Sequence, residues 1–272
     1  MRTVSIVMNY YNRPIELALT LKSIEKYVGD HNIQIIIVDD ASDDNKKALP
    51  VITNSNLDIE LIEISKEEKT WKNPCIAYNI GFDKVKGDVV IIQNSECLHI
   101  GDMISYAVNN LTDKNYFTFS CFSINYKITE QIKAVWDNNF QEVSNILTKI
   151  IKDQPKLSNW VGWYNHIKYR PSAFHWLSAI TSKNLKELGG FDERYAHGYS
   201  YDDNDLLLRI KIKELEVQIV SEEFGYAVHQ QHPRVDRSTS FSNPVNQINY
   251  KLFFKLKAEY EKKYGKTYEG CH

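Results

Sequence analysis

Short apolar runs rich in valine and isoleucine alternate with segments of helical periodicity along the first half of the chain. The runs are Val4 to Tyr10, Ile33 to Val38, Ile59 to Ile64 and Val89 to Ile92. Between the first two, Ile15 to Tyr27 carries leucines and isoleucine at helical spacing behind a proline suited to a first turn. This alternation predicts an α/β fold, in which a mixed, mostly parallel sheet is flanked by helices on both faces.

The second half of the chain has a less regular pattern. It predicts a strand from Tyr116 to Tyr126 and a polar, mainly helical stretch from Glu130 to Lys152. Beyond Pro155, aromatic residues crowd a stretch of weak periodicity, which suggests a loop-rich insertion that walls a cleft. The remaining elements are expected at Ser182 to Leu188 (helix), Asp203 to Lys213 (helix), Val217 to Val220 (strand) and Val245 to Tyr264 (basic helix). Because no repeat or low-complexity linker interrupts the chain, we expect residues 1–126 and 127–272 to be two halves of one domain.

Charge and composition narrow the classes of partner. The formal net charge of −2 argues against a nucleic-acid-binding surface, so we expect no nucleic-acid partner. No apolar run approaches the roughly 20 residues that cross a bilayer, and no signal-length apolar core opens the chain, so a cytoplasmic protein is expected. The four cysteines, which lack CxxC spacing, are expected to be ordinary thiols: Cys75, Cys97, Cys121 and Cys271.

Three polar clusters follow predicted strands, at Asn9 to Arg13, Asp39 to Asp44 and Gln93 to Glu96. Any one of them is explained by ordinary turn chemistry, and Ser42 or Asp43 is placed to cap a helix. Together they would lie at the carboxyl edge of the sheet, where ligands bind in open α/β folds and where gathered carboxylates need a cation or donor group. The chain has neither GxGxxG after its first strand nor GxxxxGK[ST], so a bound diphosphate would need a metal ion.

The motifs at these positions resemble those of the GT-A nucleotide-sugar glycosyltransferases of the family 2 type. In the first half they are YNRP at 11–14, VDDAS at 38–42 and GDVV at 87–90. In the second half, GGFDERY at 189–195 and DDND at 202–205 are similar to the acceptor and catalytic segment of galactosyltransferase-like members. The resemblance implies a single-domain, Rossmann-like GT-A fold. Residues 1–126 would bind the nucleotide-sugar, and the loop-rich half, 127–272, would bind the acceptor and carry the catalytic groups.

The resemblance also implies which residues bind the donor nucleotide. The carboxylate of Asp40 would accept a hydrogen bond from the uracil ring, and Arg13 would offset phosphate charge. For Asp39 and Asp40, support of the local turn or helix cap is the alternative role. The nucleotide-binding residues implied in this way are Asn9, Tyr11, Asn12, Arg13, Asp39, Asp40 and Asn94.

The metal-binding DxD motif of the family falls on Asn94-Ser95-Glu96, where this sequence keeps only the final acid. Family members often place a metal-binding histidine where this chain has His229 and His232, with His229 preferred. The resemblance therefore implies a divalent ion, Mn²⁺ or Mg²⁺, held by Glu96 and one of these histidines, with Arg234 adding positive charge. Metal-independent turnover is the alternative.

The catalytic roles implied by the resemblance fall on two neighbouring acids. Asp203 would act as the general base that deprotonates the acceptor hydroxyl, and Asp202 would hydrogen-bond sugar hydroxyls. Helix capping is the alternative for both, and Asp205 with Arg209 is expected to be a structural pair at helical spacing. Aromatic rings that would stack on sugar faces are Trp176, Tyr199 and Tyr201.

These residues predict an inverting glycosyltransferase that moves a sugar from a nucleotide-sugar, by preference UDP-linked, to a hydroxyl of a glycan, lipid-linked or protein-linked acceptor. Assembly of a cell-surface polysaccharide or a glycoprotein glycan is the setting that the resemblance implies. The incomplete DxD motif keeps a non-catalytic nucleotide-sugar or glycan-binding module as the alternative, and a nucleotidyltransferase is a third. The basic C-terminal helix leaves two interpretations, peripheral membrane contact and a solvated helix face.

Overall fold

A seven-stranded sheet forms the centre of the computed structural model, which describes residues 2–137, 139–232 and 244–269. Its strands in spatial order are β10 (Glu216–Val220), β6 (Asn115–Phe119), β9 (Leu177–Thr181), β4 (Val89–Asn94), β1 (Val4–Tyr10), β2 (Ile33–Asp40) and β3 (Ile59–Ile64). Only β9 runs antiparallel to its neighbours β4 and β6, and the other pairs are parallel. The mixed, mostly parallel sheet is confirmed.

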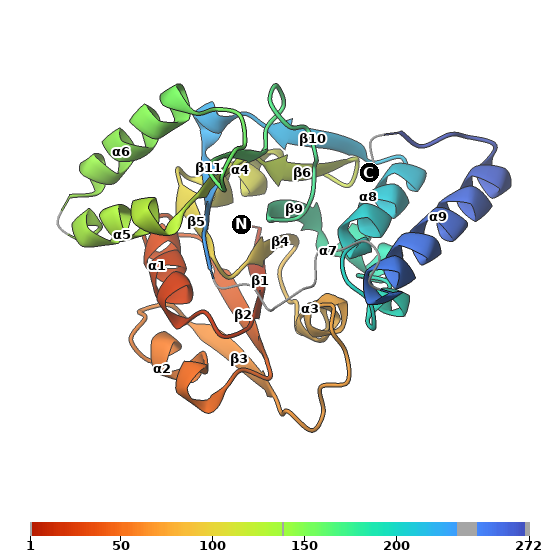
Figure 1. The fold of residues 1–272 in the computed structure, drawn as a ribbon, viewed down its shortest axis with the longest axis horizontal. Coiled ribbons are helices and arrows are strands. Elements are labelled where there is room, and N and C mark those ends of the chain that lie inside the picture. The colour runs from red at the N-terminus through yellow and green to blue at the C-terminus, as the bar shows by residue number, and fades with distance from the viewer. Residues whose placement is uncertain (1, 138, 233–243, 270–272) are drawn as a thin grey trace.

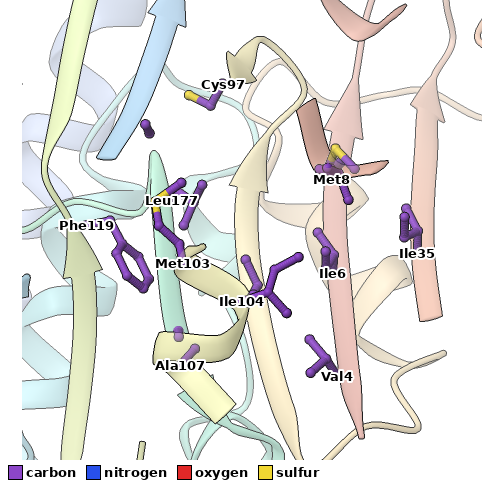
Figure 2. Packing of buried hydrophobic residues seen from close by; sticks show 14 of the residues in the cluster. Val4, Ile6, Met8, Ile35, Cys97, Met103, Ile104, Ala107, Phe119 and Leu177 are labelled. Carbon is purple, nitrogen blue, oxygen red and sulfur yellow. The ribbon is translucent and has the colours of Figure 1, made fainter. Parts of the chain in front are cut away.

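Helices cover both faces of this sheet because its strands are apolar on both sides. On one face, Val4, Ile6 and Met8 pack with α1 (Pro14–Glu25) and α4 (Met103–Asn110), and Figure 2 shows the α4 side chains beside those of β1. On the other face, Val7 packs with α3 (Cys75–Phe82), α7 (Ser182–Leu188) and α8 (Asp202–Ile212). Short helical turns, α2 (Leu49–Ile52), η1 (Asp44–Lys46), η2 (Glu193–Tyr195) and η3 (Glu222–Phe224), complete the connections.

A second sheet joins distant parts of the chain. Its strands in order are β5 (Cys97–Ile100), β11 (Tyr226–Gln230), β7 (Cys121–Ile124) and β8 (Gly162–Asn165). The helices α5 (Tyr126–Val135) and α6 (Phe140–Asp153) share an apolar cluster with it and lie beside α1 (Figure 1). Because β11 pairs with β5, His229 lies opposite Cys97. The second sheet therefore brings the segment that follows β11 next to the end of β4.

The structure corrects three of the expected elements. The strand predicted from Tyr116 to Tyr126 is two strands, β6 and β7, in different sheets; they part at Ser120, whose hydroxyl donates to Val220 O over 2.8 Å. The predicted helical stretch is likewise two helices, and the loop-rich insertion contains β8 and β9. Neither proposed helix cap forms: Asp43 precedes η1 without a side-chain cap, and the Ser42 hydroxyl accepts a hydrogen bond from Asn12 N.

The C-terminal helix α9 (Pro244–Tyr264) packs on α8, where Phe253 and Leu256 meet Leu207 and Leu208 in one cluster. No described helix is long and apolar enough to cross a membrane. The thiols of Cys75, Cys97 and Cys121 are free and buried, as expected, whereas Cys271 lies outside the described residues.

Gly81 lets α3 lie close to the sheet, and we expect Gly81→Ala to destabilise the protein. A Cβ atom there would lie 2.6 Å from Val7 Cγ1 and 3.2 Å from Val38 Cγ2. Overpacking of this kind costs about 1–3 kcal/mol, which exceeds the roughly 1 kcal/mol that alanine gains in a helix. Urea unfolding would measure the loss, with Asn109→Ala on the exposed side of α4 as the control. An unchanged or higher free energy of unfolding would show that the packing here adapts.

Candidate active site

The three polar clusters meet at the carboxyl edge of the large sheet. The strands β2, β1 and β4 are neighbours, and their register places Tyr10 beside Asp39 and Asn9 beside Asn94. Parallel strands end on the same edge, so the residues that follow them face one region. The prediction that these clusters share one edge is confirmed.

Asp40 is buried at this edge and is already paired. Its carboxylate accepts hydrogen bonds from Lys69 Nζ at 2.6 Å and from Trp71 Nε1 at 2.9 Å. Burial raises the pKa of Asp40, and the Lys69 charge offsets this only in part. Lys69 also lies 4.6 Å from the centre of the Tyr11 ring. Lys69 and Trp71 belong to the segment between β3 and α3, which shows no motif in the sequence, and only the tertiary structure places them here.

Asp39 and Asn12 hold the loops of this edge in place. Both Asp39 oxygens accept backbone N–H groups, from Ser42 at 3.0 Å and Ala48 at 2.9 Å. The Asn12 side chain exchanges two hydrogen bonds with Asp43, of 3.0 and 2.8 Å, from a left-handed backbone conformation with φ of 56°. These contacts favour the structural alternative for Asp39, whose acceptor atoms are engaged within its own loop.

Glu96, His229 and His232 form a compact cluster. The Nε2 atoms of His229 and His232 lie 3.3 and 3.5 Å from Glu96 Oε1, and one ligand atom from each residue lies within 4.8 Å of the others. Glu96 is only 2% exposed, and its second oxygen accepts a 2.6 Å bond from Arg13. All three residues are candidates from the sequence. From the sequence only one of the two histidines is expected at the metal site, whereas both face the carboxylate of Glu96.

The charges in this cluster suit a metal ligand set. Burial would raise the pKa of Glu96, yet Arg13 and the two histidines outweigh it and hold that pKa well below its usual range. Burial also lowers the pKa of His229, which favours the neutral imidazole that metals bind. Two imidazoles and one carboxylate fit Mn²⁺, iron or Zn²⁺ better than Mg²⁺, which prefers oxygen ligands. Arg13 is therefore a partner of the cluster, and Arg234 lies outside the described residues.

The two catalytic candidates sit in the first turn of α8, each against a different partner. Asp202 is buried and accepts a 2.7 Å hydrogen bond from Asn73 Nδ2. Asp203 is one-third exposed, and its buried Oδ1 meets His175 Nδ1. Tyr201, not an aspartate, is the residue before the helix, and it makes no side-chain cap. The capping alternative therefore does not account for this pair.

These neighbours give the two acids different protonation chemistry. Burial, together with the Asp203 charge, raises the pKa of Asp202 to about 6. Burial lowers the pKa of His175, but the carboxylate of Asp203 more than compensates, and the net effect is a raised pKa. His175 and Asn73 were missed in the sequence because they lie in no motif and reach α8 only in the folded chain.

Tyr78 connects the acidic pair to the cluster of Glu96, His229 and His232. Its hydroxyl donates to Asn94 Oδ1 over 3.1 Å, and its ring centre lies 5.2 Å from that of His175. Asn94 Nδ2 in turn lies 3.5 Å from Glu96 Oε1. The position that departs from the DxD motif, Asn94, is thus hydrogen-bonded to Tyr78 and Glu96, and the ring contact of Tyr78 with His175 continues the connection toward the acidic pair.

The three aromatic candidates for sugar stacking lie in different surroundings. Tyr201 packs against Tyr250 and Phe253 of α9, with ring centres 5.6 Å from each, which makes it part of that interface rather than a sugar platform. Trp176 is half-buried beside Tyr164, and Tyr199 is half-buried in the turn before α8. The structural pairing of Asp205 with Arg209 is confirmed by a 2.6 Å bond.

The fold and this edge define a GT-A glycosyltransferase architecture, and the sequence comparison agrees. The family described as "Glycosyltransferase like family 2" matches residues 5–268, so the chain belongs to that family. No curated protein sequence matches it.

Solved structures share the fold at low sequence identity. One is S. aureus TarS, residues 1–349, in complex with UDP-GlcNAc, at 12% identity, a TM-score of 0.62 and coverage of 96% of this chain and 66% of that one. A second is GalNAc-T7 with UDP, GalNAc and Mn²⁺, at 16% identity and a TM-score of 0.62, with coverage of 96% of this chain and 50% of that one. A third is the mannosyltransferase PcManGT from Pyrobaculum calidifontis, in complex with GDP-Man and Mn²⁺, at 15% identity and a TM-score of 0.55, with coverage of 99% of this chain and 66% of that one. This chain thus spans about two-thirds or less of the length of these structures.

The pKa of Asp202 predicts a pH-dependent gain in stability for Asp202→Asn. The folded-state pKa of about 6 exceeds the usual 3.8, so protonation of Asp202 stabilises the folded wild-type protein. This contribution is complete below about pH 4 and is lost as the pH rises to and through about 6. The variant keeps an oxygen for Asn73 and carries no charge, so it should be more stable by up to about 3 kcal/mol at neutral pH. Melting temperatures between about pH 4 and 7 would measure this, against the exposed control Asp153→Asn. A constant difference across that range would contradict the assignment.

Proposed function

We propose that the protein is an inverting glycosyltransferase that moves a sugar from a nucleotide-sugar to a hydroxyl of a glycan, lipid-linked or protein-linked acceptor. One observation carries the proposal. The acidic pair of α8 and the Glu96 cluster lie at the same sheet edge and are joined through Tyr78 and Asn94. A general base close to a diphosphate-binding group is what transfer to a hydroxyl requires.

The nucleotide is assigned to the edge formed by β1 and β2. Tyr11, Lys69 and Trp71 frame the buried Asp40 and would accept a base ring. A hydrogen bond from the base to Asp40 requires Lys69 to share that carboxylate or to move toward the phosphates. The related folds hold UDP-GlcNAc, GDP-Man and UDP. We prefer a UDP-sugar, since an imide N–H pairs well with a carboxylate.

Glu96, His229 and His232 are the residues that would hold a divalent ion, with Mn²⁺ preferred over Mg²⁺ for this ligand set. When bound, such an ion stabilises the negative charge that develops on a leaving diphosphate. Arg13 adds a fixed positive charge beside Glu96. This charge would stabilise a leaving diphosphate in the same way as the metal ion.

Asp203 is assigned as the general base. His175 occupies its buried Oδ1, so the accessible part of the carboxylate is left to face an acceptor hydroxyl. The hydroxyl would attack the anomeric carbon opposite the diphosphate while Asp203 takes its proton, and the configuration at that carbon inverts. Asp202, with its pKa of about 6, can bind a sugar hydroxyl as donor or acceptor. His175 is a positioning residue in this arrangement.

A non-catalytic binding module is the less favoured alternative. Its support is the replacement of the first acid of the DxD motif by Asn94. Two histidines beside Glu96 would complete a ligand set, Asn94 has its own hydrogen-bonding role, and the acidic pair has two distinct environments. A binding module has no need of a base held by a buried imidazole.

Membrane contact through α9 remains part of the proposal for lipid-linked acceptors. Lys251 and Lys255 are exposed on the same side of this helix as the exposed Ile248 and Phe254. Basic and apolar side chains together are typical of helices that lie on anionic bilayers. Polysaccharide assembly in the cytoplasm is the setting we propose.

Removal of the base should abolish transfer without loss of nucleotide binding. Asp203→Asn is expected to lower the transfer rate by about 10²- to 10⁴-fold, the usual contribution of general base catalysis. Binding of UDP, measured by calorimetry, should stay as in the wild type because the nucleotide is assigned to Asp40, Tyr11 and Trp71, whereas Asp203 pairs with His175. Asp153→Asn on exposed α6 is the control of equal charge change. Wild-type transfer by Asp203→Asn would reject the base assignment.

Loss of either histidine should weaken metal binding. His229→Ala and His232→Ala are each expected to lower Mn²⁺ affinity in the presence of UDP by at least about tenfold, the smaller end of what even outer-shell mutations cost. Electron paramagnetic resonance of free Mn²⁺ measures this independently of catalysis. The exposed His197, changed to alanine, is the control. Equal Mn²⁺ affinity in all four proteins would argue that the cluster holds no metal.

A further inference from the structure

The loop between η2 and α8 sets the direction from which the acidic pair enters the site. It runs from Tyr195 to Tyr201, and its last two residues, Ser200 and Tyr201, have left-handed backbone with φ of 60° and 68°. Residues other than glycine keep such a conformation only where the surrounding structure enforces it. Since Asp202 and Asp203 follow directly, the contacts that hold this backbone also fix where the two carboxylates point.

One side chain from the C-terminal helix holds both ends of this loop. Asn249 of α9 donates from Nδ2 to Tyr195 O over 2.9 Å and to Ser200 O over 2.8 Å. The side chain is fully buried, with 0% of the residue exposed. Because the two N–H groups of one planar amide point in fixed directions, this pair of bonds fixes the separation of the loop ends and the orientation of the Ser200 carbonyl.

The middle of the loop is shaped to admit the Asn249 amide. A Cβ atom at Gly198 would overlap Asn249 Oδ1 and would lie 2.5 Å from its Cγ. The backbone of Gly198 is not left-handed, so the close approach of the amide, and not φ, explains the glycine. The loop and the amide therefore fit each other, and a larger residue at position 198 would push them apart.

Packing of α9 does not by itself explain an asparagine at position 249. The residue lies one turn before Phe253, whose ring packs in the cluster between α8 and α9. Asparagine is a weak helix former, and its Oδ1 is buried without a hydrogen-bond partner among the described residues, which is unfavourable. An apolar side chain of similar size would avoid both costs. The two bonds that the amide donates to the loop are therefore the better explanation for it.

A second set of contacts ties the loop to the segment before α3. Ala196 O accepts backbone N–H groups from Lys72 at 2.8 Å and from Asn73 at 3.0 Å. The side chain of Asn73 also bonds to Asp202, so this segment holds the loop and one of the acids together. The two hydrogen bonds of Asn249 go to the loop alone, and its influence on the acids passes through the backbone that precedes α8.

We propose that Asn249 is a positioning residue for the acidic pair. Its two hydrogen bonds hold the loop so that α8 begins in the direction that brings Asp203 to His175 and, in the proposed reaction, to the acceptor hydroxyl. The proposal rests on the proposed transfer function only for that last step, because the pairing of Asp203 with His175 is measurable without a substrate.

Titration of His175 reports where Asp203 lies. Burial lowers the pKa of His175, and the carboxylates of Asp203, Asp202 and Glu96 together raise it above its usual value, while the ring of Tyr78 packs against the imidazole. Only Asp202 and Asp203 belong to α8, so a shift at the start of this helix changes their effect and leaves that of Glu96. The test uses the full chain with ¹³C-labelled histidine. NMR follows its 8 histidines as the pH is raised from about 5, and His175→Gln identifies the signal of His175.

Asn249→Leu removes both donors and keeps a buried side chain of similar size. The pKa of His175 should fall in this variant, because the imidazole stays buried while the carboxylate of Asp203 moves away. The control is Leu256→Ala, at a buried leucine two turns further along α9. It should melt at a lower temperature and keep the His175 pKa of the wild type. An unchanged His175 pKa in Asn249→Leu, or an equal fall in Leu256→Ala, would overturn the proposal.

Gly198→Ala tests the same contact from the loop side, with every residue of α9 unchanged. Its Cβ would displace the amide of Asn249 from the loop, so the pKa of His175 should fall here as well. This variant decides the question if Asn249→Leu does not fold. A His175 pKa equal to that of the wild type would then reject the role of Asn249.

Hydrolysis of nucleotide-sugars separates failure of this proposal from failure of the proposed function. The probes are UDP-glucose, UDP-N-acetylglucosamine and GDP-mannose with Mn²⁺, and water takes the place of the acceptor hydroxyl. Asn249→Leu should lower kcat at least about tenfold, because a displaced base slows the chemical step, and should leave the KM for the nucleotide-sugar close to that of the wild type. Leu256→Ala should keep both values.

A wild-type kcat in Asn249→Leu would show that the amide does not position the base. If the wild-type protein hydrolyses none of the probes, the proposed function loses support. In that case the titration of His175 still decides whether Asn249 sets the position of Asp203.

Discussion

A buried carboxylate, that of Glu96, is the constraint around which the site is organised. Burying an ionised acid without compensation is strongly unfavourable, so the fold must bring positive or donor groups to it. Arg13 comes from the turn after β1, and His229 and His232 come from the end of β11 and the residues beyond it. The second sheet exists in the right place to make this possible, because β11 pairs with β5 directly after Glu96. The pairing of β11 with β5 therefore both completes the second sheet and supplies the groups that compensate the buried charge of Glu96.

The two neighbouring acids of α8, Asp202 and Asp203, are accommodated in a different way, because each lies in a different environment. Two neighbouring carboxylates in one helical turn repel each other unless their surroundings differ. Asp202 is buried against the neutral Asn73, and Asp203 is partly exposed against the imidazole of His175. Left-handed backbone at Ser200 and Tyr201 turns the chain into α8 just before them. This left-handed backbone at Ser200 and Tyr201 lies beside the acids assigned to substrate, where such strain is commonly found.

Much of the fold was predictable because local pattern and tertiary environment agree. Val4 to Tyr10 and Val89 to Ile92 are apolar on both faces and are central strands of the large sheet. The misses were short strands, such as β5, β8 and β11, of four or five residues. Segments of that length bury too few residues to show a period, and their pairing depends on partners far away in the chain.

The sequence by itself determined the α/β class and the strand-end clusters, because each is a local property of residue type and spacing, and its resemblance to a known family indicated the acidic pair and the three candidate metal ligands. Only the tertiary structure decided that both histidines face Glu96, that Asp39 and Tyr201 serve the scaffold, and that His175 and Lys69 meet the two key aspartates. The physical reason is that a side chain's partners are fixed by long-range pairing of strands and packing of loops. Local patterning carries no information about which distant group compensates a buried charge.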